Sequence, residues 1–118
     1  MISKIDEVIN ALRNDTDLTG LLKGQYVYWI KPSTTPESYI NIKEIINEES
    51  ESADDEEYAN DIEMQADIFT KGSTIPIAIR LQKIMRKLGY THQALPDDYD
   101  HETGIYHKPI RFFIKVEV

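Results

Sequence analysis

The stretch that decides the fold is Asp61-Ile62-Glu63-Met64-Gln65-Ala66-Asp67-Ile68, in which polar and apolar residues alternate without a break. A period of two residues is typical of a β-strand with one buried face and one solvated face. After Lys71-Gly72-Ser73-Thr74 the period changes, because apolar residues recur every three or four positions from Ile77 to Leu88. This spacing predicts an amphipathic helix over 74–88 that lies on the buried face of the strand.

The strand and the helix differ in charge. The predicted helix carries four cations on its outer side and no acid, whereas residues 44–70 contain eleven Asp or Glu and no Lys or Arg. The cations are Arg80, Lys83, Arg86 and Lys87. The residues alone therefore predict a domain with a polarised surface and show no catalytic constellation.

Composition limits the classes of protein to consider. With 118 residues, 41% apolar and 29% charged, the chain is expected to form a single domain over 1–118. A net charge of −8 argues against binding to nucleic acid, because that affinity comes mainly from Lys and Arg. Cysteine is absent, so disulfides and thiolate chemistry are excluded. The N-terminal residues show no secretory signal, and no apolar run approaches a membrane span, which favours the cytoplasm.

The segments before residue 58 predict helices followed by strands. The apolar stripe after Ser3 predicts a helix that this serine caps and that ends near Asn14, and the leucines at 18–22 predict a further helical turn. Aromatic and β-branched residues predict a strand over 26–30. A second strand over 38–46 slips out of alternation at Ile45-Ile46, which indicates a β-bulge.

Residues 48–57 form an acidic segment with seven carboxylates and very little apolar surface. We expect a flexible loop here that joins two antiparallel strands. With the start of the next strand, it predicts an acidic surface made of Glu48, Glu49, Glu51, Asp54, Asp55, Glu56, Glu57 and Asp61.

After the helix, the chain is predicted to form a short extended piece over 90–95, a polar loop over 96–100 and a last strand over 104–118. The order of elements lacks the βαβ alternation of a parallel sheet. We therefore expect an α+β fold with a mostly antiparallel, four-stranded sheet and two main helices packed on one face.

Candidate chemistry is sparse. Metal-ligating residue types crowd only in the segment that holds Asp97, Asp98, Asp100, His101, Glu102 and His107. Their spacing matches neither a zinc helix nor a calcium loop, so a solvated hairpin loop is favoured. The paired carboxylates of the acidic segment are solvated, whereas acid–base catalysis needs them in a cleft with separated pKa values. We expect no enzyme activity, no metal and no cofactor.

The predicted helix also presents an apolar patch. Ile75 and Ile79 lie opposite the buried stripe beside Arg86, and Phe113 and Tyr106 fall in reach of the same sheet. Such a patch among charges is typical of a subunit interface, although loops of the same chain could equally cover it. Likewise, the cations either contact a partner or solubilise the helix. The interface hypothesis comprises Ile75, Ile79, Arg80, Lys83, Arg86 and Lys87.

In combination, several segments resemble the tail-completion, or tail-terminator, proteins of long-tailed bacteriophages and prophages. They are the opening helix Ile5-Asp6-Glu7-Val8-Ile9-Asn10-Ala11-Leu12, the strand Val27-Tyr28-Trp29, Pro36-Glu37-Ser38-Tyr39-Ile40, the alternating strand with its helix, and an ending in which Asp100-His101-Glu102-Thr103-Gly104 leads to Arg111-Phe112-Phe113-Ile114.

This resemblance implies an antiparallel sheet with packed helices and subunits that form rings, typically hexameric, at the junction of tail and head. The implied partners are further copies of the chain, the tail tube protein and the head connector or stopper protein. It implies location in the virion and, during assembly, in the host cytoplasm, with no sequence-specific nucleic-acid binding and no membrane contact. A head-closure or connector protein of the same gene cluster and a monomeric acidic adaptor are the alternatives.

Overall fold

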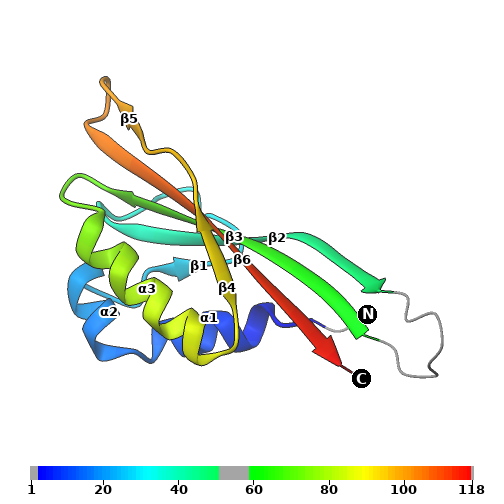
Figure 1. Ribbon diagram of the computed structural model, residues 1–118. Helices are drawn as coiled ribbons and strands as arrows, with labels where there is room; N and C mark the ends of the chain where they lie inside the picture. The colour runs from blue at the N-terminus through cyan, green and yellow to red at the C-terminus, as the bar shows by residue number, and fades with distance from the viewer. Residues whose placement is uncertain (1–2, 51–58, 118) are drawn as a thin grey trace.

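The computed structural model describes residues 3–50 and 59–117. Within these residues the chain forms three helices and six strands (Figure 1). The helices are α1 (Ile5–Arg13), α2 (Thr16–Leu22) and α3 (Ile75–Lys87). The strands are β1 (Val27–Tyr28), β2 (Tyr39–Ser50), β3 (Ala59–Thr70), β4 (Thr91–Ala94), β5 (Asp98–Asp100) and β6 (Ile105–Glu117).

The described strands form one mixed, six-stranded sheet. Its order is β1-β2-β3-β6-β4, and β5 also pairs with β6. β1 runs parallel to β2, whereas the other pairs are antiparallel. The class is α+β as predicted, but the predicted four-stranded antiparallel sheet with two main helices is wrong.

Three short strands account for the difference, because β4 forms where only a short extended piece was predicted, β5 forms in the predicted polar loop, and β1 runs parallel to β2. Only Val27 and Tyr28 of the predicted strand over 26–30 lie beside β2, and Trp29 and Ile30 are exposed beyond this pairing. β5 lies in the predicted polar loop, where Asp98–Asp100 pairs with the start of β6 through a turn that contains Gly104 at a φ of +73°. Its side chains are exposed, so no hydrophobic pattern marks this strand.

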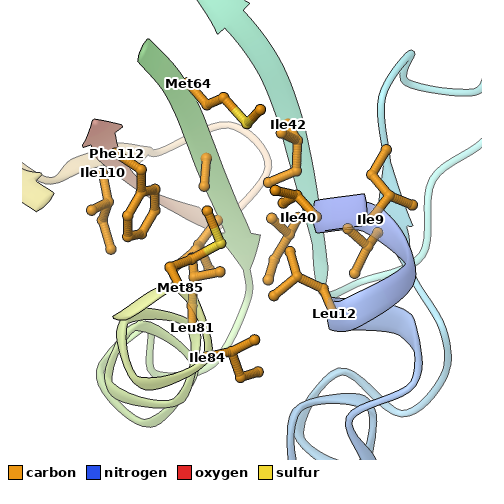
Figure 2. Close-up of a cluster of buried hydrophobic side chains, with 14 of the residues drawn as sticks. Ile9, Leu12, Ile40, Ile42, Met64, Leu81, Ile84, Met85, Ile110 and Phe112 are labelled. Carbon is orange, nitrogen blue, oxygen red and sulfur yellow. The ribbon is translucent and has the colours of Figure 1, made fainter. Parts of the chain in front are cut away.

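All three helices lie on the same face of the sheet (Figure 1). α1 and α3 lie side by side on this face. Their apolar stripes pack against the alternating apolar residues of the central strands (Figure 2). The side chains labelled in this core are Ile9, Leu12, Ile40, Ile42, Met64, Leu81, Ile84, Met85, Ile110 and Phe112. Burial of this apolar surface is the main contribution to folding stability.

The helix ends differ in part from the prediction. α1 begins at Ile5 after Lys4, and no side chain caps it, so the predicted cap by Ser3 is wrong. The predicted turn over 18–22 belongs to α2, which Asp15 caps by accepting a hydrogen bond from the backbone N–H of Leu18 at 2.8 Å. Arg13 at the end of α1 donates two hydrogen bonds to the carbonyl oxygen of Val27, at 2.9 and 2.6 Å. These bonds fix β1 against α1.

The sheet is longer than the helical layer. The described residues extend over 53 × 27 × 26 Å, and β2, β3 and β6 project beyond the helices at one end (Figure 1). We call this end, formed by 46–50, 59–63 and 113–117, the arm. β2 enters it through a register shift between Glu44 and Ile46, which confirms the predicted bulge.

Candidate interaction surfaces

The outer face of α3 presents apolar residues followed by cations. Ile75 and Ile79 are 66% and 61% exposed, although each is a large apolar side chain. Lys83, Arg86 and Lys87 are exposed and form no ion pair with any residue that the structure describes. We call these five residues the α3 face. Because each contributes little to the core, the α3 face is free to contact a partner.

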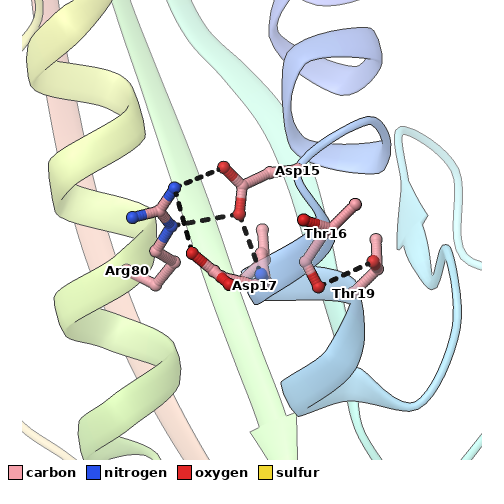
Figure 3. A network of polar contacts seen from close by, with 6 residues as sticks. Asp15, Thr16, Asp17, Thr19 and Arg80 are labelled. Atoms are coloured by element: carbon pink, nitrogen blue, oxygen red, sulfur yellow. Dashed lines mark hydrogen bonds and ion pairs between the residues drawn. The ribbon is translucent and has the colours of Figure 1, made fainter.

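Arg80 is placed differently from the other cations of the helix. Its guanidinium binds the Asp15 carboxylate through two hydrogen bonds of 3.0 and 2.7 Å and lies 3.6 Å from Asp17 (Figure 3). This fork geometry joins α3 to the N-terminus of α2. The Arg80 hydrogen bonds hold the pKa of Asp15 below its usual value, although partial burial opposes the shift. Arg80 therefore contributes to the contact between two helices of the same chain.

A hollow of about 490 Å³ lies beside the N-terminus of α3. Ile75, Tyr106 and Asp97 line it, together with the turn that precedes the helix. Tyr106 is 45% exposed and contacts Tyr99 of β5 with ring centroids 4.5 Å apart. Because Tyr106 and Ile75 line the same hollow, the tyrosine extends the apolar part of the α3 face onto the β5–β6 hairpin.

The members of the predicted acidic surface that the structure describes lie on the arm. Glu48 and Glu49 belong to β2 and are exposed, whereas Asp61 of β3 lies 3.8 Å from Lys115 of β6. Glu51, Asp54, Asp55, Glu56 and Glu57 lie outside the described residues. The flexibility of the acidic segment stays a prediction.

No helix that the structure describes lies on the second face of the sheet (Figure 1). This face carries a polar cluster around Asp67. The residue is 5% exposed, and its carboxylate lies 2.7 Å from His107 Nε2 and accepts a hydrogen bond of 2.9 Å from Gln65. Lys43 lies 3.8 Å from its other oxygen. Sequence reasoning missed this cluster, although the alternation that buries Met64 and Ala66 necessarily directs Gln65 and Asp67 to the opposite face.

Aromatic rings extend the helix-free face towards β1. Tyr39 stacks on Phe69 at 4.9 Å between ring centroids, and Phe69 stacks on His107 at 4.4 Å. Tyr28 lies 6.2 Å from Tyr39 at a tilted angle. The stack ends on His107, whose Nε2 lies 2.7 Å from the Asp67 carboxylate, so the rings and the polar cluster are continuous on this face.

The arm continues the helix-free face as a shallow hollow of about 390 Å³. Ile46 and Phe113 line it as apolar residues, and Glu48, Asp61 and Lys115 supply charge. Phe113, predicted on the wet side of its strand, is half-buried here. The hollow therefore extends across the arm, from the acidic end of β2 to the end of β6.

The acidic and histidine side chains of 97–107, which the sequence brings close together, contact different partners in the structure. Asp97 forms an ion pair of 3.1 Å with Lys108, and His107 lies on Asp67. Asp100 accepts a hydrogen bond from the backbone N–H of Glu102, which lowers the pKa of this carboxyl. In the part of the chain that the structure describes, no group of three or more His, Asp or Glu side chains is arranged to hold a metal ion. Nor does any described helix have the length and apolar character to cross a membrane.

A comparison with models of known protein families finds no match, and a comparison with curated proteins finds none either. Among solved structures, this fold is similar to that of a chain from "Virion of native gene transfer agent (GTA) particle". The TM-score is 0.67, and the likeness covers 94% of this chain and 92% of that chain at 14% sequence identity. At this identity the likeness is one of fold.

Proposed function

We propose that this protein is a non-enzymatic structural protein of a phage-type virion, with the role of tail completion. Copies of the chain form a ring, expected to be hexameric, that ends the tail tube and joins it to the head connector. The observation that carries this proposal is the likeness of fold, over nearly the full length of both chains, to a virion chain. The segments that resemble tail-completion proteins favour this role over other virion positions.

The surface of the chain agrees with head-to-tail assembly. A ring requires two different and complementary patches on each subunit. The α3 face supplies apolar anchors and three exposed cations, whereas Glu48, Glu49 and Asp61 supply the opposite sign on the arm. Rim charges of this kind mainly steer and orient the contact. Arg80, the remaining member of the predicted interface, serves it indirectly by holding α3 against α2.

The proposal predicts both a ring and an affinity for tube ends. Light scattering on the purified chain, alone and with tail tubes, measures the ring, and electron microscopy locates the protein on the tubes. A chain that stays monomeric and leaves tube ends bare contradicts the proposal and favours the acidic adaptor. Binding to the connector but not to the tube favours head closure.

A charge reversal tests the α3 face. The double variant Lys83→Glu and Arg86→Glu is expected to weaken assembly at low salt, and Lys31→Glu, which changes an exposed cation in a loop, is its control. If the unmodified chain, the double variant and Lys31→Glu assemble equally, the α3 face is not part of the interface.

A further inference from the structure

β2 and β6 leave strand edges open on opposite sides of the arm. β1 pairs only with Ile40 and Asn41 of β2, so the part of β2 beyond the bulge has no described strand on its outer side. β4 pairs with β6 only as far as Phe113, so 114–117 likewise have none. Open edges are templates for pairing with another chain.

The backbone hydrogen bonds show which peptide groups face these edges. Ile40 donates to the carbonyl oxygen of Tyr26 at 2.9 Å, so its peptide groups point to the β1 side. Peptide groups alternate along a strand, and the extra residue at the bulge shifts this alternation by one. The N–H and carbonyl of Glu49 therefore point out of the open edge of β2.

The same reasoning applies to β6. Leu95 of the β4 side donates to the carbonyl oxygen of Pro109 at 3.0 Å, which places that carbonyl towards β4. Alternation then directs the peptide groups of Arg111, Phe113, Lys115 and Glu117 to the same side. β4 meets the first two of these positions, whereas Lys115 and Glu117 face the open edge.

We propose that the open edge of β2 in one copy pairs with the open edge of β6 in the next copy, which makes one sheet continuous across the subunit contact. β2 and β6 are each antiparallel to β3, so they run in the same direction and the contact is a parallel pair. This inference rests on the proposed ring. The inference identifies β2 and β6 as the strands that would close the ring.

The register within one chain already fits such a pair. Glu48 and Lys115 lie opposite Asp61 from its two sides, so a neighbour added without stagger brings its Glu48 beside Lys115 on the same face. In a parallel pair at this register, the N–H of Glu49 donates to the carbonyl of Lys115. The facing peptide groups then interleave, and the carboxylate of Glu48 meets the ammonium of Lys115.

Charge selects this pairing over a symmetric one. Two β2 edges would bring Glu48 and Glu49 of both copies together, and like charges opposite each other on strands are destabilising. A β2 edge against a β6 edge instead meets Lys115. The end of α3 lies near the open edge of β6. Gly89, which follows this helix, is so close to Ile114 that a Cβ on the glycine would lie 3.4 Å from Ile114 Cδ1. A head-to-tail contact follows, rather than a two-fold dimer of β2 edges, and a head-to-tail contact is the kind that a ring requires.

Engineered cysteines test the pair directly, because the chain has no cysteine of its own. Glu48 and Lys115 of one chain are separated by β3, about 9 to 10 Å across two strand spacings, which is too far for a disulfide. The oxidised double variant Glu48→Cys and Lys115→Cys is therefore expected to give covalent multimers larger than a dimer. Each single variant gives dimers at most, and Lys31→Cys with Lys115→Cys is the misplaced control.

Proline at the edge gives a second test. Glu49→Pro removes the N–H that the neighbour would bind, whereas Glu49→Ala removes only the side chain. We expect Glu49→Pro to raise the concentration for half-assembly about tenfold or more and Glu49→Ala to leave it within about twofold. Thermal unfolding below the assembly concentration checks that both variants fold, and if Glu49→Pro does not, the cysteine pair decides alone.

The outcomes separate this inference from the proposed function. If the unmodified chain forms rings but the cysteine pair yields nothing beyond dimers, the strand pairing is wrong and the ring survives. If the unmodified chain forms no ring with or without tail tubes, both proposals fall. Covalent multimers that match the ring in size support both.

Discussion

The half of the sheet that the helices cover and the arm that projects beyond them are built from the same three strands, yet they expose different chemistry. In the covered half, Ile110 and Phe112 are enclosed between strands and helices. In the arm, Ile114 and Val116 continue the same alternation but are only half-buried, and the strand edges stay open. The covered half supplies most of the buried apolar surface, whereas the arm leaves backbone groups of β2 and β6 without a described strand beside them.

The largest expected effect compares two isoleucines on one strand and one face. Ile110→Ala in the covered half should lower the free energy of unfolding by about 2 to 5 kcal/mol, because it leaves a cavity in a close-packed core. Ile114→Ala in the arm should cost about 1 to 2 kcal/mol, since its side chain is already partly solvated. Urea unfolding with linear extrapolation measures both. Equal losses would show that the arm is as closely packed as the core.

The next effect tests the junction between α2 and α3. Asp15→Ala removes a helix cap and should cost about 1 to 2 kcal/mol. The control is Asp17→Ala, whose carboxylate is 75% exposed and 3.6 Å from Arg80, with an expected change within about 0.5 kcal/mol. If the two variants unfold at the same urea concentration, Asp15 does not hold the helices together.

The pH dependence of the same junction has a definite sign. Arg80 lowers the pKa of Asp15 in the folded chain below its usual value of 3.8, so the unfolded chain binds the proton more readily. The stabilisation is therefore complete above the unfolded pKa and is lost as pH falls through the folded pKa. The difference in stability between the unmodified chain and Asp15→Ala should shrink in acid, and a difference that grows there contradicts the assignment.

How far the sequence predicts this molecule depends on whether an element has one buried face. β3 and α3 are marked by the alternation over 61–68 and the stripe that ends at Leu88, because burial selects their residues. β1 and β5 depend instead on which backbone lies beside them. Residues 26–30 have strand character throughout, but only two of them meet β2.

Prediction of the candidate interaction surfaces from sequence has the same limit. Periodicity places Arg80 and Lys83 outside the buried stripe, yet it carries no information about α2, whose Asp15 is 65 positions away from Arg80. The open edges of β2 and β6 depend on where β1 and β4 stop pairing, which is a property of the assembled sheet. The bulge at Ile45-Ile46 was visible in the sequence because it interrupts an alternation.

A smaller effect, of opposite sign, comes from a polar atom in the covered half. Tyr90 is 5% exposed, and its hydroxyl finds no hydrogen-bond partner among the described residues. Tyr90→Phe removes an unpaired buried group, so we expect stability to stay level or rise by up to about 1 kcal/mol. Tyr106→Phe, at an exposed ring, is the control. A loss of stability in Tyr90→Phe would show that the hydroxyl has a partner.

Alkaline titration sharpens this test. Burial raises the pKa of Tyr90 to about 12, so the folded chain holds this proton more tightly than the unfolded chain. The stability that depends on it is complete below pH 10 and is lost as pH rises towards 12. Tyr90→Phe should therefore lose less stability than the unmodified chain between these values. Parallel losses in the two proteins would place the titrating group elsewhere.

The smallest expected effect on stability separates two kinds of cation on α3. Lys83→Glu and Arg86→Glu should each change the free energy of unfolding by less than about 0.5 kcal/mol, because neither side chain has a described ion-pair partner. Arg80→Glu places a carboxylate against Asp15 and Asp17 and should lower the melting temperature clearly. Assembly should respond in the reverse order at matched folded fraction, since Lys83 and Arg86 are exposed whereas Arg80 binds Asp15 of the same chain. Light scattering at low and high salt measures this response, because screening weakens exposed charge contacts. If Lys83→Glu and Arg86→Glu lower the melting temperature as much as Arg80→Glu, the α3 face is part of the fold and the arm alone remains as the surface for assembly.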